Sequence, residues 1–399
     1  MANSLDNIAP LLLQEALLAL RENAITPRLV NVNYSPEPTE PGTPIRIPIP
    51  RPATAYNVNA GTAGTSTDIN PRKVEIVTTT WRGTNFELND QEFTEIMNGS
   101  VPMQLSEHVK ALANAVDLDI LSLAKDKVGG TYGTTSAPND KAAILGVNQK
   151  LDSQLCPVTG RNYMVDPATK SGLLSVSDLT LGNARSEMNP PVVTGNMGES
   201  FGFTFYMNQN ISATNNPTQF QHTSGTVGAN STPANNSFLV NGAISAGAES
   251  MVVDGALAGG VLNEGTVIKF ASLDQEFVVT GTVTLTGGAG TVTFSPALPA
   301  DVADNVQVDA YKSYKIKSVA FHRNAFALAI RPFPEVPAGL GSIVSQIVDN
   351  ETGLSLRLEI TRTNNVTRFE LQILYGIAAV RPEFAVKAVQ FEGDGSFPA

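Results

Sequence analysis

One stretch of the sequence has the spacing of a catalytic motif. Gly198-Glu199-Ser200-Phe201-Gly202 fits the G-x-S-x-G pattern of the nucleophile elbow, in which a serine hydroxyl attacks an acyl carbonyl. The elbow needs a strand before the serine and a helix after it. The letters after Gly202, F-T-F-Y-M, instead predict an aromatic strand. A glycine-flanked turn into a strand explains the same residues, so a serine hydrolase using Ser200 is the weakest of three functional hypotheses.

The other side chains with metal-binding chemistry do not form a motif. The three histidines are His108, His222 and His322. None stands in an H-x-x-x-H or H-x-H pair, so a histidine metal site is not expected. Asp301, Asp304 and Asp309 could hold a divalent cation, although a solvated acidic loop is the simpler interpretation. There is also no Walker loop, EF-hand loop or G-x-G-x-x-G run. We therefore expect no metal, no cofactor and no catalytic residues.

The composition favours a protein that associates with itself over one that binds nucleic acid. Of the 399 residues, 42% are hydrophobic and 16% are charged, which fits a chain that buries surface against its own copies. The formal net charge of −11 disfavours a grip on phosphates, because that affinity comes from clustered lysine and arginine. The single cysteine, Cys156, excludes an intrachain disulfide and fits synthesis in a reducing cytoplasm.

Neither a secretion leader nor a membrane span is expected from the sequence. The first residues lack a basic segment, and Gln14 and Glu15 interrupt their apolar run. No window is long and apolar enough to cross a bilayer. We therefore expect a protein that is soluble when it is synthesised and that has no membrane partner.

Residues 101–128 predict a long helix around which the rest of the chain is organised. Apolar residues recur there in alternating steps of three and four, which places them on one helix face. They are Leu105, Val109, Leu112, Val116, Ile120 and Leu123. Ser100 can cap the start, and Gly129-Gly130 ends the helix. At 1.5 Å per residue the helix is about 40 Å long. This length fits a long helix in an ordinary α+β core or the spine of a plate-like subunit.

Residues 4–22 predict an amphipathic helix at the N-terminus. Its apolar face includes Leu12 and Leu20. Such a face must pack on something, and two alternatives stay open, which are the core of the same chain and a neighbouring subunit. Both leucines are candidate contacts between subunits.

Residues 34–82 predict a long projecting hairpin, with a disordered linker as the alternative. Residues 34–52 are dense in proline, which excludes a helix or a central strand. Ile45, Ile47 and Ile49 alternate opposite a β-branched strand expected at residues 73–81. Small polar and glycine residues between them suit a loop tip. We expect this tip to contact a neighbouring subunit through Asn57, Asn59, Thr62, Thr65 and Asp68.

Shorter elements are expected on both sides of the long helix. A short helix at residues 87–97 would precede it, and another at residues 139–155 would follow it. Tyr163, Met164 and Val165 predict a short buried strand, after which Asp166-Pro167 begins a further helix.

The composition changes at about Ala213 and changes back at about Lys312. Between them the chain is rich in Gly, Thr, Ala, Val and Asn and has short β runs separated by turns. This pattern is typical of a small antiparallel sandwich or barrel, and its position indicates an inserted domain. Two strong strand candidates follow it, at residues 354–362 and 367–373.

Two runs in the C-terminal half resemble the coat proteins of P22-like tailed phages. They are S-V-A-F-H-R-N-A-F-A-L-A-I-R-P at residues 318–332 and L-Y-G-I-A-A-V-R-P-E at residues 374–383. These coat proteins are major capsid proteins with the HK97-type fold, and the order of parts agrees along nearly the whole chain. The resemblance implies an α+β fold with an N-arm, an E-loop hairpin, a long spine helix and an axial domain that is interrupted by a small antiparallel β-domain.

The resemblance also implies boundaries for these parts. They are 1–33 for the N-terminal arm, 34–82 for the E-loop hairpin, 83–128 for the peripheral domain with the spine helix, 129–212 for the first part of the axial domain, 213–312 for the inserted β-domain and 313–399 for the second axial and peripheral part.

The function implied by the resemblance is that of a non-enzymatic shell subunit. It would assemble into the hexamers and pentamers of an icosahedral head that encloses double-stranded DNA without binding a particular sequence. Its expected partners are its own copies, scaffolding and portal proteins and a decoration protein, and its expected location is the virion, after synthesis in the host cytoplasm. A secreted or surface β-rich adhesin is the main alternative. The Gly/Thr/Asn-rich insertion fits an adhesin, whereas the amphipathic arm and the long helix do not.

Overall fold

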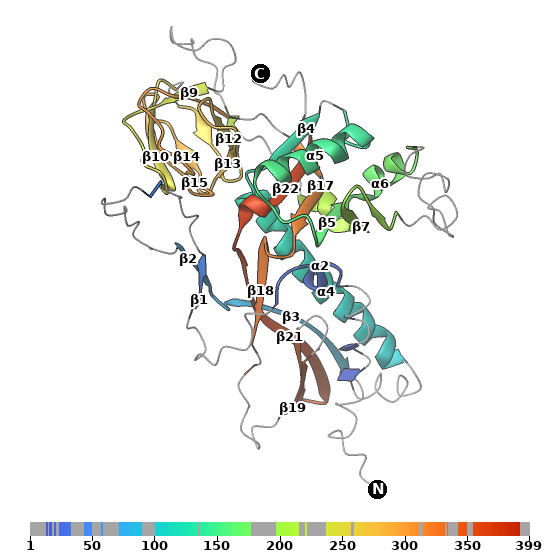
Figure 1. Ribbon diagram of the computed structural model, residues 1–399. Helices are drawn as coiled ribbons and strands as arrows, with labels where there is room; N and C mark the ends of the chain where they lie inside the picture. The colour runs from blue at the N-terminus through green and yellow to red at the C-terminus, as the bar shows by residue number, and fades with distance from the viewer. Residues whose placement is uncertain are drawn as a thin grey trace.

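In the computed structural model, one long helix joins two sheets, and a closed barrel and a two-stranded hairpin lie to one side of them (Figure 1). The structure describes residues 13–14, 16–17, 20, 24–32, 44–49, 57–58, 72–89, 100–134, 136–176, 197–214, 220–221, 237–256, 259–310, 314–331, 333, 342–348 and 354–391. Helical and strand residues are both frequent in these parts, so the chain is an α+β protein.

The long helix is α4, Ser100–Lys127, and it matches the helix expected at residues 101–128. The apolar stripe faces the core: Leu105, Val109, Leu112, Val116 and Ile120 are buried, and the partly buried Leu123 packs against the same core. Lys125 and Lys127 lie in the last turn, where positive charge interacts favourably with the helix dipole. The helix ends before Gly129 and Gly130, as expected.

One side of α4 lies against an antiparallel sheet, which we call the peripheral sheet. Its strands are β3 (Thr80–Asn89), β18 (Phe326–Ile330), β19 (Ser342–Val348), β20 (Ser355–Thr363) and β21 (Val366–Ala379). The order is β18-β21-β20-β19, and β3 also pairs with β21. The helix expected at residues 87–97 is wrong where it can be checked, because residues 87–89 continue β3. Asn89 pairs with Val366 there, and residues 90–97 lie outside the described parts.

A second sheet, which we call the axial sheet, lies at the other end of α4 (Figure 1). Its order is β4-β22-β17-β5-β7-β6, and its strands are β4 (Thr131–Thr134), β5 (Arg161–Val165), β6 (Glu199–Ser200), β7 (Phe203–Met207), β17 (Tyr314–His322) and β22 (Ala385–Phe391). The helix α5 (Lys141–Ser153) connects β4 to β5, and α6 (Pro167–Leu173) follows β5 in the chain. Asp140 caps α5 and Asp166 caps α6, each by accepting from a backbone N–H three residues on.

The chain between the two halves of the axial sheet forms a closed antiparallel barrel. The order around it is β10-β15-β13-β12-β16-β9, and the strands are β9 (Ser237–Val240), β10 (Ser250–Asp254), β12 (Val267–Phe270), β13 (Glu276–Val279), β15 (Gly290–Ser295) and β16 (Gln307–Ala310). A small sheet is formed by β8 (Phe220–Gln221), β11 (Val261–Leu262) and β14 (Val283–Thr284), and the last two lie between barrel strands in the sequence. Three phenylalanine rings, those of Phe270, Phe277 and Phe294, pack edge to face inside the barrel, which therefore has its own core.

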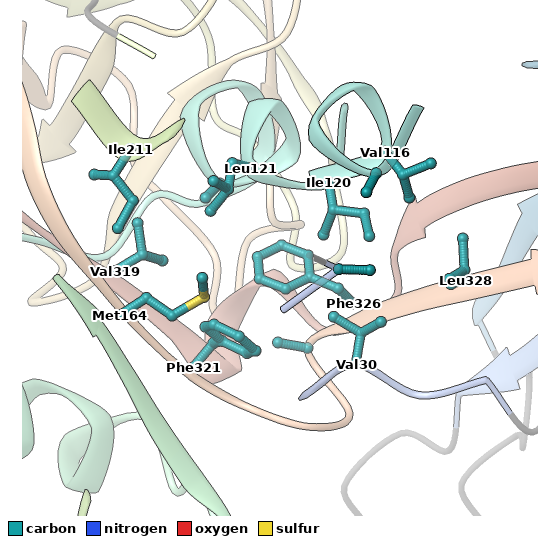
Figure 2. Packing of buried hydrophobic residues seen from close by; sticks show 14 of the residues in the cluster. Val30, Val116, Ile120, Leu121, Met164, Ile211, Val319, Phe321, Phe326 and Leu328 are labelled. Atoms are coloured by element: carbon teal, nitrogen blue, oxygen red, sulfur yellow. The ribbon is translucent and has the colours of Figure 1, made fainter. Parts of the chain in front are cut away.

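The main core lies where α4 crosses from one sheet to the other. Figure 2 shows Val116, Ile120 and Leu121 of α4 directed toward Val319 and Phe321 of β17 and toward Phe326 and Leu328 of β18. Val30, just after the short helix α2 (Thr26–Leu29), and Ile211 in η2 (Gln209–Thr214) join this cluster. The spine helix therefore holds both sheets in one continuous core.

Candidate assembly surfaces and the joint between barrel and spine

The serine of the G-x-S-x-G sequence lies in a hairpin and not in a nucleophile elbow. Ser200 ends the two-residue strand β6 and pairs with Phe203 of β7. Phe201 and Gly202 form the turn with positive φ angles of 51° and 79°. The strand that follows replaces the helix that would present the hydroxyl in a hydrolase. The glycine-flanked turn expected from the sequence is what the chain forms.

Two acidic residues of the insertion support barrel loops, and a third joins the strands β16 and β9. Asp301 accepts from the Ala246 N–H at 2.7 Å, and Asp304 accepts from the Gly242 N–H at 2.7 Å. Asp309 accepts from the Ser237 hydroxyl at 2.6 Å. Within the described residues, no group of three or more His, Cys, Asp and Glu side chains comes together in a way that could hold a metal ion.

The histidines are placed separately. His108 lies half-buried on α4, where its Nδ1 is 2.6 Å from the Thr84 hydroxyl and its ring stacks on Phe86. It links the helix to β3 and is more covered than a residue on an open helix face. His322 ends β17, where burial lowers its pKa, and His222 lies outside the described residues.

The proline-rich segment contains the hairpin that its alternation predicts. β1 (Ile45–Ile49) pairs antiparallel with β2 (Arg72–Ile76), with Ile45 opposite Ile76. The isoleucines at 45 and 47 are buried against Ala327 and Ala329 of β18. The strand expected at residues 73–81 is divided, because β2 ends at Ile76 and β3 begins at Thr80. The hairpin is therefore seated on the edge of the peripheral sheet at one end.

The other end of the hairpin is described at two residues. Asn57 is exposed, and the adjacent Val58 keeps 81% of its surface accessible. The remaining tip residues expected to contact a neighbour, Asn59, Thr62, Thr65 and Asp68, lie outside the described residues. An exposed valine beside an exposed asparagine leaves apolar surface available to another molecule.

The base of the hairpin also carries exposed apolar surface. Trp81, the single tryptophan of the sequence, is 61% exposed although its ring packs against Phe333 at 5.5 Å. The Arg357 guanidinium lies over the Phe333 ring, 5.0 Å from its centroid. The backbone of Val77, between β2 and β3, passes so close to Gly376 of β21 that a Cβ on Gly376 would overlap the Val77 carbonyl.

Of the two N-terminal leucines expected to contact a neighbouring subunit, the structure describes only Leu20. Leu20 is fully buried and belongs to the main core of its own chain. This differs from the expected contact with a neighbour, because the side chain has no surface left to offer one. Leu12 lies outside the described residues.

Two carboxylates on α4 tie distant segments to the helix. Asp117 is buried and accepts from the Thr26 N–H at 3.2 Å and from Asn208 Nδ2 at 3.0 Å. Burial raises the pKa of Asp117 to about 6. Asp119, two residues on, binds Arg82 of β3 and accepts a hydrogen bond from the Tyr375 hydroxyl. The period-3.6 pattern could not identify these partners, because they come from four other parts of the chain.

The barrel is seated at the C-terminal end of α4. Val267 and Val278 point out of the barrel and are buried in the main core. Glu276 extends from β13, accepts from the Thr131 N–H at 2.6 Å and forms an ion pair with Lys150 of α5. A Cβ at Gly129 would overlap the Glu276 carbonyl. The glycine after the helix therefore ends it and also admits the barrel backbone.

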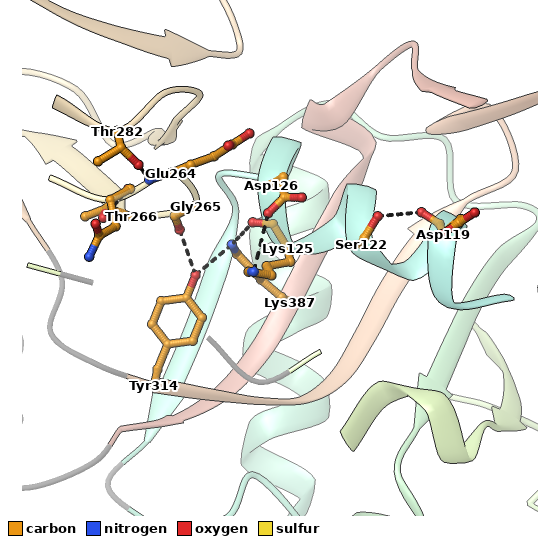
Figure 3. Close-up of polar contacts among 11 residues, drawn as sticks. Asp119, Ser122, Lys125, Asp126, Glu264, Gly265, Thr266, Thr282, Tyr314 and Lys387 are labelled. Carbon is orange, nitrogen blue, oxygen red and sulfur yellow. Dashed lines mark hydrogen bonds and ion pairs between the residues drawn. The ribbon is translucent and has the colours of Figure 1, made fainter. Parts of the chain in front are cut away.

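A second set of polar contacts joins β22, α4, β17 and the barrel (Figure 3). Lys387 of β22 is fully buried, and its Nζ donates to the Lys125 carbonyl at 3.1 Å and to Tyr314 Oη at 2.9 Å. The Tyr314 hydroxyl donates to the Gly265 carbonyl of the barrel at 3.2 Å. Tyr314 and Lys387 were not singled out in the sequence, where nothing local marks them.

Comparison with solved structures relates this arrangement to known folds. The chain is similar to the capsid structure of cyanophage P-SCSP1u, with a TM-score of 0.50 and 11% sequence identity over 93% of this chain and 89% of that chain. The chain has the HK97-type fold. It is also similar to a structure from Mycobacterium phage Che8, with a TM-score of 0.49 and 15% identity over 92% of this chain and 90% of that chain.

The sequence comparisons give no relative. No family model matches the chain, and no curated protein matches it. Within the described residues, the helices are all too short or too polar to cross a membrane. The HK97-type fold, with its spine helix and inserted antiparallel barrel, is the fold that the resemblance implied.

Proposed function

We propose that this chain is the major capsid protein of a tailed phage, a structural and non-enzymatic subunit of the virion. The observation that carries the proposal is the similarity to a phage capsid structure along 93% of this chain. The two C-terminal runs at residues 318–332 and 374–383 support the P22-like branch. The division into an N-arm, E-loop, peripheral domain, axial domain and insertion at the boundaries given above is part of this proposal.

The subunit assembles with its own copies into hexamers and pentamers of a closed icosahedral head. The hairpin supports this step, because it has exposed residues at its tip and is anchored at its base. Asn57, Asn59, Thr62, Thr65 and Asp68 are the proposed contacts at the tip, and Leu12 is the proposed contact in the arm. Scaffolding and portal proteins are the proposed assembly partners, and a decoration protein would bind the outer surface.

The head encloses double-stranded DNA without reading its sequence. The net charge of −11 supports a lining that does not hold phosphates tightly, because strong binding would hinder packaging and release. The adhesin hypothesis would leave the spine helix and the seated hairpin without a role.

Electron microscopy tests the proposal. The full chain should be expressed alone and together with a scaffolding protein from the same phage, and the particles should be imaged after purification. We expect closed icosahedral shells in at least the co-expressed sample. A monomer or a fibre in every condition, with the scaffolding protein present, would exclude a capsid subunit.

A further inference from the structure

A buried lysine connects three parts of the molecule that are far apart in sequence. Lys387 has no exposed surface, yet its Nζ reaches the Lys125 carbonyl in the last turn of α4 and Tyr314 Oη on β17. Carbonyls in the last turn of a helix lack an intrahelical partner, and a lysine is well suited to bind them. Lys387 therefore caps the spine helix from a distant strand.

The tyrosine extends this contact to the barrel. A phenol hydroxyl has one proton to donate and can accept in return, whereas an ammonium group donates and cannot accept. With Lys387 charged, its Nζ donates to Tyr314 Oη, and the tyrosine proton is directed to the Gly265 carbonyl. The distances of 2.9 Å and 3.2 Å describe this arrangement, which links α4 to the barrel through two side chains.

We propose that Lys387, Tyr314 and the Gly265 carbonyl form a proton-controlled latch between the spine helix and the barrel. In the closed state the ammonium group donates to the tyrosine, and the tyrosine donates to the barrel. When Lys387 loses its proton, the neutral amine gains a lone pair that accepts the tyrosine proton. The Tyr314 hydroxyl then turns to Lys387 and leaves the Gly265 carbonyl without this bond.

The charged groups around Lys387 place this change near neutral pH. The pKa of Lys387 is lowered to about 7, chiefly by burial and also by the positive charge of Lys125. Asp126 of α4 and Glu276 of the barrel raise it and so limit the shift. Asp126 is itself surrounded by Lys125, Lys127, Lys387 and the barrel residue Glu264, and burial raises its pKa. Glu276 is paired with Lys150 of α5, so its charge is shared between two lysines.

Opening the latch loosens the barrel and does not release it. Val267 and Val278 stay buried in the main core, and Glu276 keeps its bonds to Thr131 and Lys150. The hydrogen bonds of a charged donor are stronger than those of a neutral one. The barrel is therefore held most firmly to the spine when Lys387 carries its proton.

Spin labels across the joint test the latch in the full-length chain. The exposed residues Val252 on β10 and Leu145 on α5 are changed to cysteine and labelled, and the native Cys156 is buried. The distance distribution between the labels is measured by pulsed electron paramagnetic resonance over the range from about pH 6 to about pH 8.5, which spans the pKa of about 7. We expect a narrow distribution at the acidic end and a broader one at the basic end.

Variants separate the latch from a general effect of pH. Tyr314→Phe removes the relay and should give the broad distribution at both ends of the range. Lys387→Met should remove the pH dependence. Tyr163→Phe, which deletes another buried hydroxyl bound to Ser318 on β17, and Lys315→Met, which deletes an exposed lysine, should keep the pH dependence.

Two results would overturn the latch. One is a wild-type distribution that does not change over the range. The other is a Tyr314→Phe variant that keeps the wild-type pH response. The second result decides the matter even if Lys387→Met does not fold.

Discussion

Arg82 of β3 and Asp119 of α4 form a bidentate ion pair between the peripheral sheet and the spine helix. Arg82 Nη2 lies 2.8 Å from Asp119 Oδ1, and Arg82 Nε lies 3.1 Å from Asp119 Oδ2. The Tyr375 hydroxyl of β21 donates to the same carboxylate. One side chain on the helix thus holds two adjacent strands of the sheet.

Removing Arg82 should lower the free energy of unfolding less than removing Asp119. The arginine side chain is 49% exposed, so Arg82→Ala should lower the free energy of unfolding by less than about 1 kcal/mol. Asp119→Ala also leaves the buried Tyr375 hydroxyl without its acceptor and should cost about 1–3 kcal/mol. Denaturant unfolding of the isolated subunit measures both. Lys110→Ala, which breaks an exposed pair with Glu107, is the control and should change little. Equal losses in Arg82→Ala and Asp119→Ala would contradict the role given to Tyr375.

A charge on the buried face of α4 should prevent folding. Val116 is fully buried in the main core, so Val116→Asp places an unpaired carboxylate there and should cost more than about 4 kcal/mol. Asn114→Asp adds the same carboxylate to an exposed position of the same helix and serves as the matched control. Soluble yield and circular dichroism of the two variants give the comparison. A well-folded Val116→Asp protein would show that this face is not part of the core.

The stability of the subunit should depend on pH through Asp117. Its pKa rises from 3.8 in the unfolded chain to about 6 in the fold, so the folded state binds the proton more tightly. The stability from this group is fully present below the unfolded pKa and is lost as pH rises through about 6. The loss is about 3 kcal/mol at most.

The difference between the wild type and Asp117→Asn isolates this effect. Other titrating groups contribute equally to both proteins, so the difference in unfolding free energy should move in favour of the variant between about pH 4 and about pH 7. Denaturant unfolding at several pH values measures it. A difference that stays constant over this range would mean that Asp117 does not titrate in the fold.

A methyl group at Gly129 should disturb the seat of the barrel. A Cβ there would overlap the Glu276 carbonyl, which is backbone and cannot turn away. Gly129→Ala should therefore lower the free energy of unfolding by about 1–3 kcal/mol. Gly281→Ala, whose Cβ would meet only the Thr293 hydroxyl at 3.6 Å, is the control within the barrel. Comparable stability of the two variants would argue against a close seat at Gly129.

Removing the tip of the hairpin should affect assembly and not folding. Deletion of residues 57–68 leaves β1 paired with β2 and the base seated on β18. The subunit should unfold at the same denaturant concentration as the wild type, whereas shells should form poorly or break at lower denaturant. Unfolding of the isolated subunit by the deletion itself would instead mean that the tip belongs to the subunit's own core.

The sequence by itself determined the elements whose stabilising contacts are local. The alternating steps of three and four from Leu105 to Leu123 predict α4 because helix neighbours are three and four residues apart. Asp166 marks the start of α6 because a cap bonds within its own first turn. The alternation at Ile45 and Ile47 likewise predicts a strand with one buried side.

The tertiary structure decided every feature that depends on a distant partner. Residues 87–89 form a strand because β21 pairs with them, although the local sequence favoured a helix. Leu20 is buried by its own chain, and Asp117 meets Thr26 and Asn208, because the fold brings those segments to one point of the helix. Tyr314 and Lys387 have no local signal at all. The fold brings β17, β22, α4 and the barrel together at these two residues. Their burial and their hydrogen-bond partners are therefore set by the tertiary structure and not by the local sequence.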